Sequence, residues 1–267
     1  MPGSIIKKTC VKGWRAMDKG LQEEQEAEYN INEVIRVRGN IYGFLSRGFR
    51  KAIDEGYLKD IEEIVPAFDM LTADTEDAVL KNGAMCLKAF AESIKNTPEV
   101  LEELNREYST LLLGIVSEHM SYPCESVYLS PAHMVMQEQR NEVLEFYTKH
   151  NSGVVDDFKN PEDHVSAELS FISRLCELTL EDLGNDDMKG ALEKLKAQKE
   201  FMYAHLLRWV HLLCTDLKKA AKAEFKGGFY ECLADLTMGY ARIDIKFLDG
   251  LIEMMEEQEK DKLSSKE

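Results

Sequence analysis

The sequence predicts an all-α protein, a single-domain helical bundle of about nine to eleven helices. Through most of the chain, apolar residues recur at steps of three, four or seven, which is the spacing of one helix face. Only 6 prolines and 16 glycines interrupt 267 residues, fewer than the frequent turns of an all-β protein would need. No pair of alternating segments indicates a β-hairpin.

The N-terminal helices follow from this spacing. The first begins near Ile31 and is expected to end at Gly56. A shorter helix runs from Tyr57 to about Met70, with Pro66 bending or ending it.

The middle of the chain predicts two further helices and one long connection. Asp74 or Thr75 is a suitable N-cap for the third helix, and Pro98 fits the first position of the fourth. Residues 119–136 have no helical pattern and are rich in tyrosine and methionine. A connection of this length inside a domain is more often functional than idle.

The C-terminal half predicts longer helices with clear breaks. One helix covers Glu138 to His150, and the most regular pattern begins after Asn160. Glycines at 184 and at 227–228 separate the last three helices, of which the final one runs from Phe229 to about Met255.

The domain organisation predicted from these patterns has three parts. Residues 1–28 are a poorly patterned leader in which Met17 is an alternative start, 29–255 form the helical domain, and 256–267 are a charged tail. The leader lacks the apolar segment of a secretory signal, and no run approaches the ~20 apolar residues of a membrane span. We therefore expect a cytoplasmic protein without stable membrane insertion.

Charge and cysteine spacing exclude several classes of site. The 49 acidic residues exceed the 33 basic ones, for a net charge of -16, which disfavours nucleic acid. The same charge suits either a basic partner or simply solubility, and net charge alone does not choose between the two. The spacing of the cysteines includes no C-x-x-C pair, so neither a zinc knuckle nor a thioredoxin-like motif is expected. We expect free thiols in a reducing compartment at all six positions: Cys10, Cys86, Cys124, Cys176, Cys214 and Cys232.

Catalytic motifs are absent from the sequence. It contains no Glu-x-x-His pair for a di-iron centre, no H-E-x-x-H, no phosphate-binding glycine loop and no G-x-S-x-G. His164 and Glu168, one helical turn apart, are the best remaining metal pair, and a surface or packing role explains them more simply. We predict no catalytic residues, no metal, no cofactor and no enzymatic activity.

The segment from Asn160 to Phe171 has the composition of a helix start. Asn160 can serve as N-cap, Pro161 fits the first helical position, and Glu162 and Asp163 place negative charge in the first turn. This interpretation leaves His164 unexplained.

Three motifs then show a resemblance to a known family. The run Pro161-Glu162-Asp163-His164 with Glu168, Leu169 and Phe171 resembles the E-P-x-D-H-x-x-x-E-L-x-F signature of TorD/DmsD/NarJ-type chaperones. The stretch YPCESVYLSP from Tyr122 to Pro131 is similar to the tyrosine-rich P-x-E-S loop of that family. Phe201, His205, Leu206 and Trp209 match its F-x-x-x-H-L-x-x-W. The motifs occur in the family's order.

The resemblance implies a TorD-like helical domain that binds a molybdopterin oxidoreductase precursor in the cytoplasm, through its twin-arginine leader or its apoprotein, until the cofactor is inserted. An arginine-bearing leader calls for carboxylates beside an apolar groove. The residues expected to contact the client are Tyr122, Glu125, Tyr128, Glu162, Asp163, His164 and Glu168, with Met134 and Met136 suited to the groove. Pro161, Phe171, Phe201, His205 and Trp209 are expected to form the supporting scaffold.

Two other functions remain open at this stage. The chain can be a permanent helical subunit of an oxidoreductase complex, or a metal-dependent enzyme using His164 and Glu168. Because the sequence is acidic and lacks a recognisable catalytic motif, it favours the chaperone and subunit hypotheses over the enzyme. Glycine hinges at 184 and 227–228 also allow a homodimer formed by domain swapping.

Overall fold

The computed structural model describes residues 31–94, 99–115, 121–151 and 159–264. Over these ranges the regular structure is helical, with a single isolated β-bridge between Cys124 and His164, so the all-α prediction is confirmed. The elements are α2 (Ile31–Arg50), α3 (Glu55–Thr72), α4 (Ala78–Ile94), α5 (Val100–Leu111), α6 (Glu125–Leu129), α7 (Glu138–Lys149), α8 (Val165–Gly184), α9 (Met188–Phe201), the π-helical turn η1 (Met202–Leu206), α10 (Leu207–Phe225) and α11 (Phe229–Ser264).

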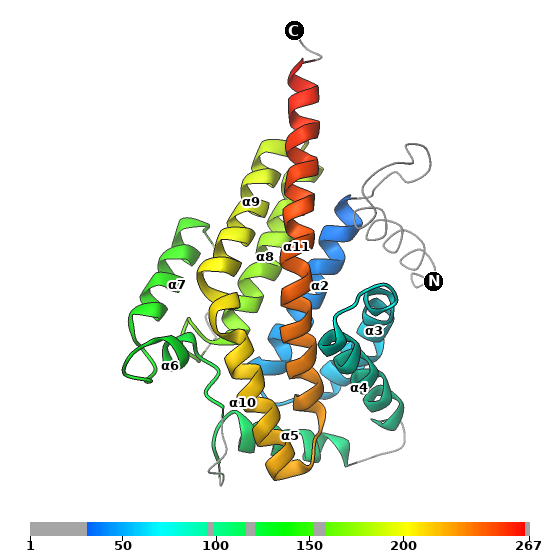
Figure 1. Cartoon of the computed structure of the whole chain (residues 1–267), viewed down its shortest axis with the longest axis vertical. Helices are drawn as coiled ribbons and strands as arrows, with labels where there is room; N and C mark the ends of the chain where they lie inside the picture. The colour runs from blue at the N-terminus through cyan, green and yellow to red at the C-terminus, as the bar shows by residue number, and fades with distance from the viewer. Residues whose placement is uncertain (1–30, 95–98, 116–120, 152–158, 265–267) are drawn as a thin grey trace.

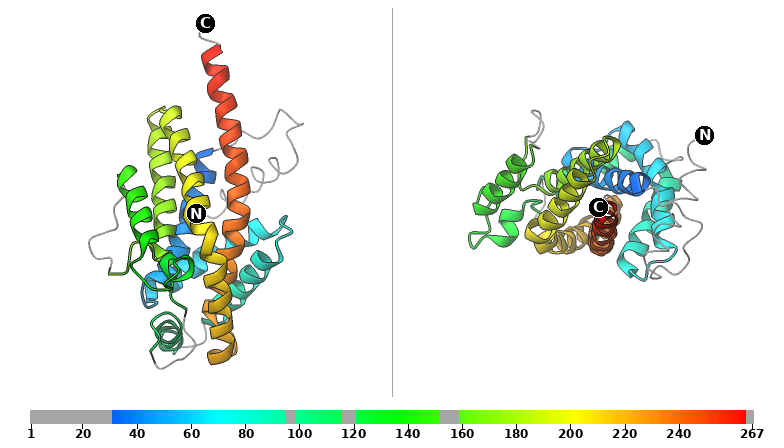
Figure 2. Two further views of the ribbon diagram at one scale, coloured as in Figure 1. Left: turned by 60° about the vertical axis from the view of Figure 1, so that its left-hand side comes forward. Right: turned by 90° about the horizontal axis from the view of Figure 1, so that it is seen from above.

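Helix α11 forms the central axis of the molecule (Figure 1). It packs against α4 on one side and against α9 and α10 on the other, while α2 packs along α8. Helices α6 and α7 lie on the opposite side of the bundle from α3 and α4, as both further views agree (Figure 2). The apolar faces of these helices meet in one continuous buried core.

A buried ion pair joins α2 to α11. Arg38 donates two hydrogen bonds to Asp244, of 2.7 and 2.9 Å, and a third of 2.8 Å to Gln198 of α9. Tyr42 donates a further 2.7 Å bond to Asp244. All four residues are fully buried, and such a group is tolerated because nearly every polar atom has a partner.

Two glycines and a disulfide mark the crossing of α4 and α11. A Cβ at Gly83 would lie 2.7 Å from the Leu236 backbone nitrogen, and one at Gly239 would lie 2.7 Å from that of Leu80. Only glycine allows the two backbones to approach this closely. Cys86 and Cys232 form a disulfide at the same crossing.

The prediction of six free thiols is therefore wrong for Cys86 and Cys232. Their pairing arises from the facing surfaces of two helices, 146 residues apart in sequence, which spacing alone does not reveal. Cys124, Cys176 and Cys214 are free and buried, as expected, and Cys10 lies outside the described residues.

Several predicted helix boundaries are also wrong. Gly56 does not end the first helix; it lies in the first turn of α3, which Asp54 caps and which continues through Pro66. The cap before α4 is Asp77, whose carboxylate accepts the Leu80 N–H, and neither Asp74 nor Thr75 takes this place. The last helix continues beyond Met255 to Ser264, into the predicted tail.

Some sequence predictions fall on residues that the structure does not describe. The leader with Met17, and Pro98 at the start of the fourth helix, lie outside the described ranges. Among the helices that the structure does describe, none combines the length and apolar character needed to cross a membrane.

Glu107 of α5 is buried beneath the turn between α10 and α11. Its carboxylate accepts the Tyr230 N–H at 3.3 Å at the start of α11, and a Cβ at Gly228 would lie 2.6 Å from it. Gly228 also has φ +137°, a backbone conformation that other residues rarely adopt. Glycine is therefore needed both for this backbone conformation and for the lack of a side chain next to Glu107. Burial raises the pKa of Glu107 to about 7, against the opposing effect of the backbone N–H groups.

Replacing Asp244 with asparagine is expected to destabilise the protein by about 3–5 kcal/mol, because Arg38 is left buried without its counter-charge. Urea unfolding followed by far-UV circular dichroism measures this. The matched control is Arg36→Gln on α2, the helix that also carries Arg38. Arg36 pairs with Glu33 at the surface, and loss of this pair is expected to cost less than about 1 kcal/mol. Equal effects of the two variants would contradict a structural role for the buried pair.

Glu107 predicts a specific pH dependence of stability. Because its folded-state pKa is raised from 4.5 to about 7, its contribution is fully present below pH 4.5 and is lost as the pH rises through 7. Relative to wild type, Glu107→Gln should therefore gain stability between these limits, by up to about 3 kcal/mol. Urea unfolding of both proteins from pH 4 to 8 tests this. A constant difference across the range would refute the assignment.

Candidate functional site

Backbone hydrogen bonds join two of the three motif segments. The Glu125 N–H donates to the Asp163 carbonyl at 2.9 Å, and the Val165 N–H donates to the Pro123 carbonyl at 2.8 Å. These bonds flank the bridge between Cys124 and His164. The start of α6 is thereby fixed beside the start of α8.

Asp163 reinforces this junction by capping α6 from another segment. One oxygen of its buried carboxylate accepts the Ser126 N–H at 2.8 Å and also the Ser126 hydroxyl. Its other oxygen, Oδ1, is buried without a hydrogen-bond partner. The side chain therefore positions α6, and the carboxylate keeps unused accepting capacity.

The prediction that Asn160 caps α8 is wrong. The helix begins at Val165, and its N-cap is His164, whose Nδ1 accepts the Ser166 N–H at 3.1 Å. Pro161, Glu162 and Asp163 consequently lie in the turn before the helix, because pairing with the α6 segment holds the backbone extended at His164. Burial lowers the pKa of His164 to about 3, so the ring is neutral at physiological pH.

Glu125 projects from α6 into the interior. Its Oε2 contacts His205 Nδ1 at 2.9 Å, while Oε1 lies 4.0 Å from Arg208 and has no hydrogen-bond partner. The carboxylate is fully buried, and burial raises its pKa although His205 and Arg208 oppose the shift.

Glu168 lies next to Glu125, in the first turn of α8. The indole N–H of Trp209 donates to both of its carboxylate oxygens at 3.1 Å. Burial, followed by the neighbouring charge of Glu125, raises the pKa of Glu168 well above its ordinary value. Two adjacent buried carboxyl groups with raised pKa values favour a state in which one of them is protonated.

Glu162 is the most accessible carboxylate of the group. It pairs with Arg140 of α7 through both guanidinium branches, one at 2.8 Å. Partial burial is the largest single effect and acts to raise its pKa, but the hydrogen bond and charge of Arg140, together with a backbone N–H, outweigh it and the pKa is lowered. Tyr147 also donates to the Glu162 carbonyl at 3.0 Å, which ties α7 to this turn.

The predicted tyrosines and methionines do not join this group equally. Tyr128 stacks on Trp209, with ring centroids 5.6 Å apart, and is partly buried. Tyr122 is 48% exposed, and Met134 and Met136 are exposed still further, so none of the three is buried with the carboxylates. The 119–136 stretch also contains the short helix α6, which its sequence pattern did not predict.

The predicted scaffold residues contact the site directly. Phe171 and Phe201 pack at 4.7 Å, and both contact Phe146 of α7. His205 and Trp209 bind Glu125 and Glu168, as described above. Pro161 accepts the His164 N–H at 3.0 Å within the turn.

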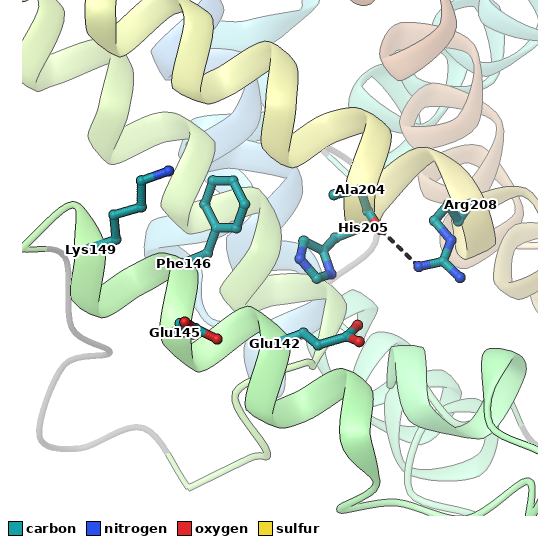
Figure 3. Close-up of a pocket in the computed structure, with 7 residues that line it drawn as sticks. All are labelled: Glu142, Glu145, Phe146, Lys149, Ala204, His205 and Arg208. Carbon is teal, nitrogen blue, oxygen red and sulfur yellow. Dashed lines mark hydrogen bonds between the residues drawn. The ribbon is translucent and has the colours of Figure 1, made fainter.

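A groove opens beside His205, between α7 and the η1–α10 segment (Figure 3). Its volume is about 420 Å³. The π turn η1, of a kind frequent at functional sites, carries two of its lining residues. The groove is lined by Glu142, Glu145, Phe146, Lys149, Ala204, His205 and Arg208.

Sequence reasoning did not find Arg140, Glu142, Glu145 or Arg208. Arg208 directly precedes Trp209 of the third motif, so its position offered a signal. The α7 residues carry none, because only the fold places that helix beside η1.

The His164–Glu168 pair is not arranged as a metal site. His164 Nδ1 is engaged by Ser166, and both oxygens of Glu168 accept from Trp209. Across the described ranges, no group of three or more histidine, cysteine, aspartate or glutamate side chains is placed to hold a metal ion.

Comparison with known proteins identifies the class. The family model for the nitrate reductase delta subunit matches residues 76–215, more than half of the chain and the whole of the site. The protein therefore belongs to this family, and the resemblance seen in the motifs is confirmed.

Named relatives agree with this. The chain is 27% identical to the chaperone protein TorD of Vibrio atlanticus, over 80% of this chain and 95% of that protein. It is also 27% identical to the chaperone protein TorD of Shewanella pealeana, over 82% and 93%. The crystal structure of a proposed redox enzyme maturation protein from Archaeoglobus fulgidus aligns over 86% and 96%, at 19% identity and a TM-score of 0.38.

The contact between Trp209 and Glu168 makes the site's protonation measurable. With Trp14→Phe, Trp209 is the only tryptophan left in the chain. Its fluorescence should change with a midpoint well above 4.5 as the coupled carboxyl groups ionise, and stability should fall as the pH rises through the same midpoint. Glu168→Gln should abolish the fluorescence change, whereas Glu162→Gln should retain it. A transition that survives in Glu168→Gln would contradict the assignment.

Proposed function

We propose that this protein is a cytoplasmic assembly chaperone, and not an enzyme. It binds the precursor of a molybdopterin-containing oxidoreductase, through a twin-arginine leader or the apoprotein, until the cofactor is inserted. Membership of the delta subunit family and the relatives named as TorD chaperones support this proposal.

One observation carries the proposal: the meeting of the α6 and α8 motif segments at the bridge between Cys124 and His164. It gathers the carboxylates of Glu125, Glu162, Asp163 and Glu168. Of these, Glu125 reaches the groove, since it contacts His205 and lies 4.0 Å from Arg208, both of which line it. Guanidinium groups match carboxylates in geometry and charge, and the ring of Phe146 suits the apolar segment that follows the arginines in such a leader. The net charge of -16 favours a cationic client.

A permanent subunit of an oxidoreductase complex is the second candidate, favoured by the family's description as a nitrate reductase delta subunit. Affinity purification of the tagged protein from its own cells separates the two. Capture of precursor enzyme that lacks its cofactor supports the chaperone, whereas capture of only mature, cofactor-loaded enzyme supports the subunit.

A labelled peptide with two adjacent arginines followed by an apolar segment should bind, more weakly as salt is added. Glu162→Gln should weaken binding a few-fold, because it removes one of the negative charges that attract the two arginines. Fluorescence anisotropy measures both effects. The matched control is Glu177→Gln, which removes an exposed carboxylate from α8 away from the groove.

Asp163→Asn is expected to weaken binding by a different route. Its loss of charge at the α6 cap loosens the placement of Glu125, while overall helix content measured by circular dichroism stays unchanged. Normal peptide binding by both Glu162→Gln and Asp163→Asn would reject this site for the client.

A further inference from the structure

The groove already contains a cation that belongs to the protein itself. Arg208 is 49% exposed in its side chain, and its Nη1 lies 4.0 Å from Oε1 of the fully buried Glu125. The same nitrogen donates a 3.0 Å hydrogen bond to the Ala204 carbonyl, as Figure 3 shows. Arg208 therefore offsets part of the charge of Glu125 without forming a hydrogen bond to it.

A second arginine occupies the neighbouring carboxylate. Arg140 and Glu162 form a two-branched pair in which both side chains are partly buried. Glu162 immediately precedes Asp163, whose carbonyl binds the backbone of Glu125. Two guanidinium groups of the chain, that of Arg208 on α10 and that of Arg140 on α7, thus lie next to two carboxylates of one site.

We propose that Arg208 and Arg140 are internal placeholders, which a client's paired arginines displace from Glu125 and Glu162. This inference rests on the proposed function and adds the regulation of its site. A cationic segment binds only when its guanidinium groups replace those of the chain, so the resting protein holds its acidic site neutralised.

The two placeholders differ in strength, and this sets the order of exchange. Glu125 Oε1 has unused accepting capacity, since it is buried without a hydrogen-bond partner. An incoming guanidinium that donates to it gains a charge-assisted bond that Arg208 does not make. Glu162 is already bonded through both oxygens, so its exchange brings no new bond. Displacement is therefore expected to begin at Arg208.

The test is the affinity of Arg208→Gln for the peptide with two adjacent arginines. Loss of a residue that lines a binding groove normally lowers the affinity for the ligand. Here the affinity should rise instead, by about tenfold if Arg208 covers the site about nine-tenths of the time. Arg140→Gln should also tighten binding, and it provides a second variant should one of the two fold poorly. Circular dichroism checks the helix content of each.

Removal of any positive charge could strengthen binding to a cationic peptide, so the controls are matched for charge. Lys219→Gln removes an exposed cation from the same helix, three turns from Arg208, and should change affinity less than twofold. An equal gain in Lys149→Gln, at the other end of the groove, would show a general charge effect and overturn the proposal.

The outcomes also separate this inference from the proposed function. If wild type binds the peptide and Arg208→Gln binds it equally or more weakly, the placeholder role is overturned and the chaperone assignment stands. No binding of the peptide by wild type or by either arginine variant rejects leader recognition itself. A peptide with two lysines in place of the arginines should gain less from Arg208→Gln, because an ammonium lacks the planar fork.

Discussion

The buried contact of Arg38 with Asp244 and Gln198 sets the position of the elements that carry the site. It holds α2 against α9 and α11, and α2 in turn aligns α8, since Ser173 donates to the Gly39 carbonyl and Ser46 donates to the Ser166 carbonyl. Ser166 lies in the first turn of α8, and Gln198 lies one turn before Phe201. A buried ion pair adds little net stability over apolar packing, but it admits few alternative registers. The placement of Glu168 and His205 therefore depends on a contact far from either.

The site itself is costly to bury. Glu125 and Asp163 each keep one buried oxygen without a hydrogen-bond partner, and an unsatisfied buried group costs about 1–3 kcal/mol. The raised pKa values of Glu125 and Glu168 show the same cost in electrostatic terms. Apolar side chains of similar size would fill this space more stably. Unused accepting capacity next to a groove is instead the property expected of a site completed by a cationic ligand, which supports the binding role proposed above.

The sequence allowed the fold class and the breaks at 184–187 and 227–228 to be predicted, because helical spacing and glycine act locally. Its motifs also identified Glu125, Asp163 and Glu168, which meet where α6 and α8 begin, but not the two arginines that lie beside them. The cap of α8 was misassigned, because tertiary pairing with α6 overrides the local preference of Asn160. The disulfide of Cys86 and Cys232 was not predicted, since it joins two helices distant in sequence. The ion pair of Arg140 with Glu162 was not predicted either, since only the fold places α7 against the turn before α8.

Placeholders on the chain also affect selectivity. A tethered side chain competes at an effective concentration of roughly millimolar, whatever the dilution of the client. A ligand with one arginine has to displace one placeholder arginine and gains only one set of hydrogen bonds in return. A ligand with two adjacent arginines has to displace both placeholders, but once the first arginine is bound, the second exchange is intramolecular and therefore favoured. Because lysine cannot reproduce the two-branched geometry that Arg140 makes with Glu162, exchange favours arginine over lysine as well. An acidic protein that would otherwise attract many cationic segments thus discriminates through the arginines that it already contains.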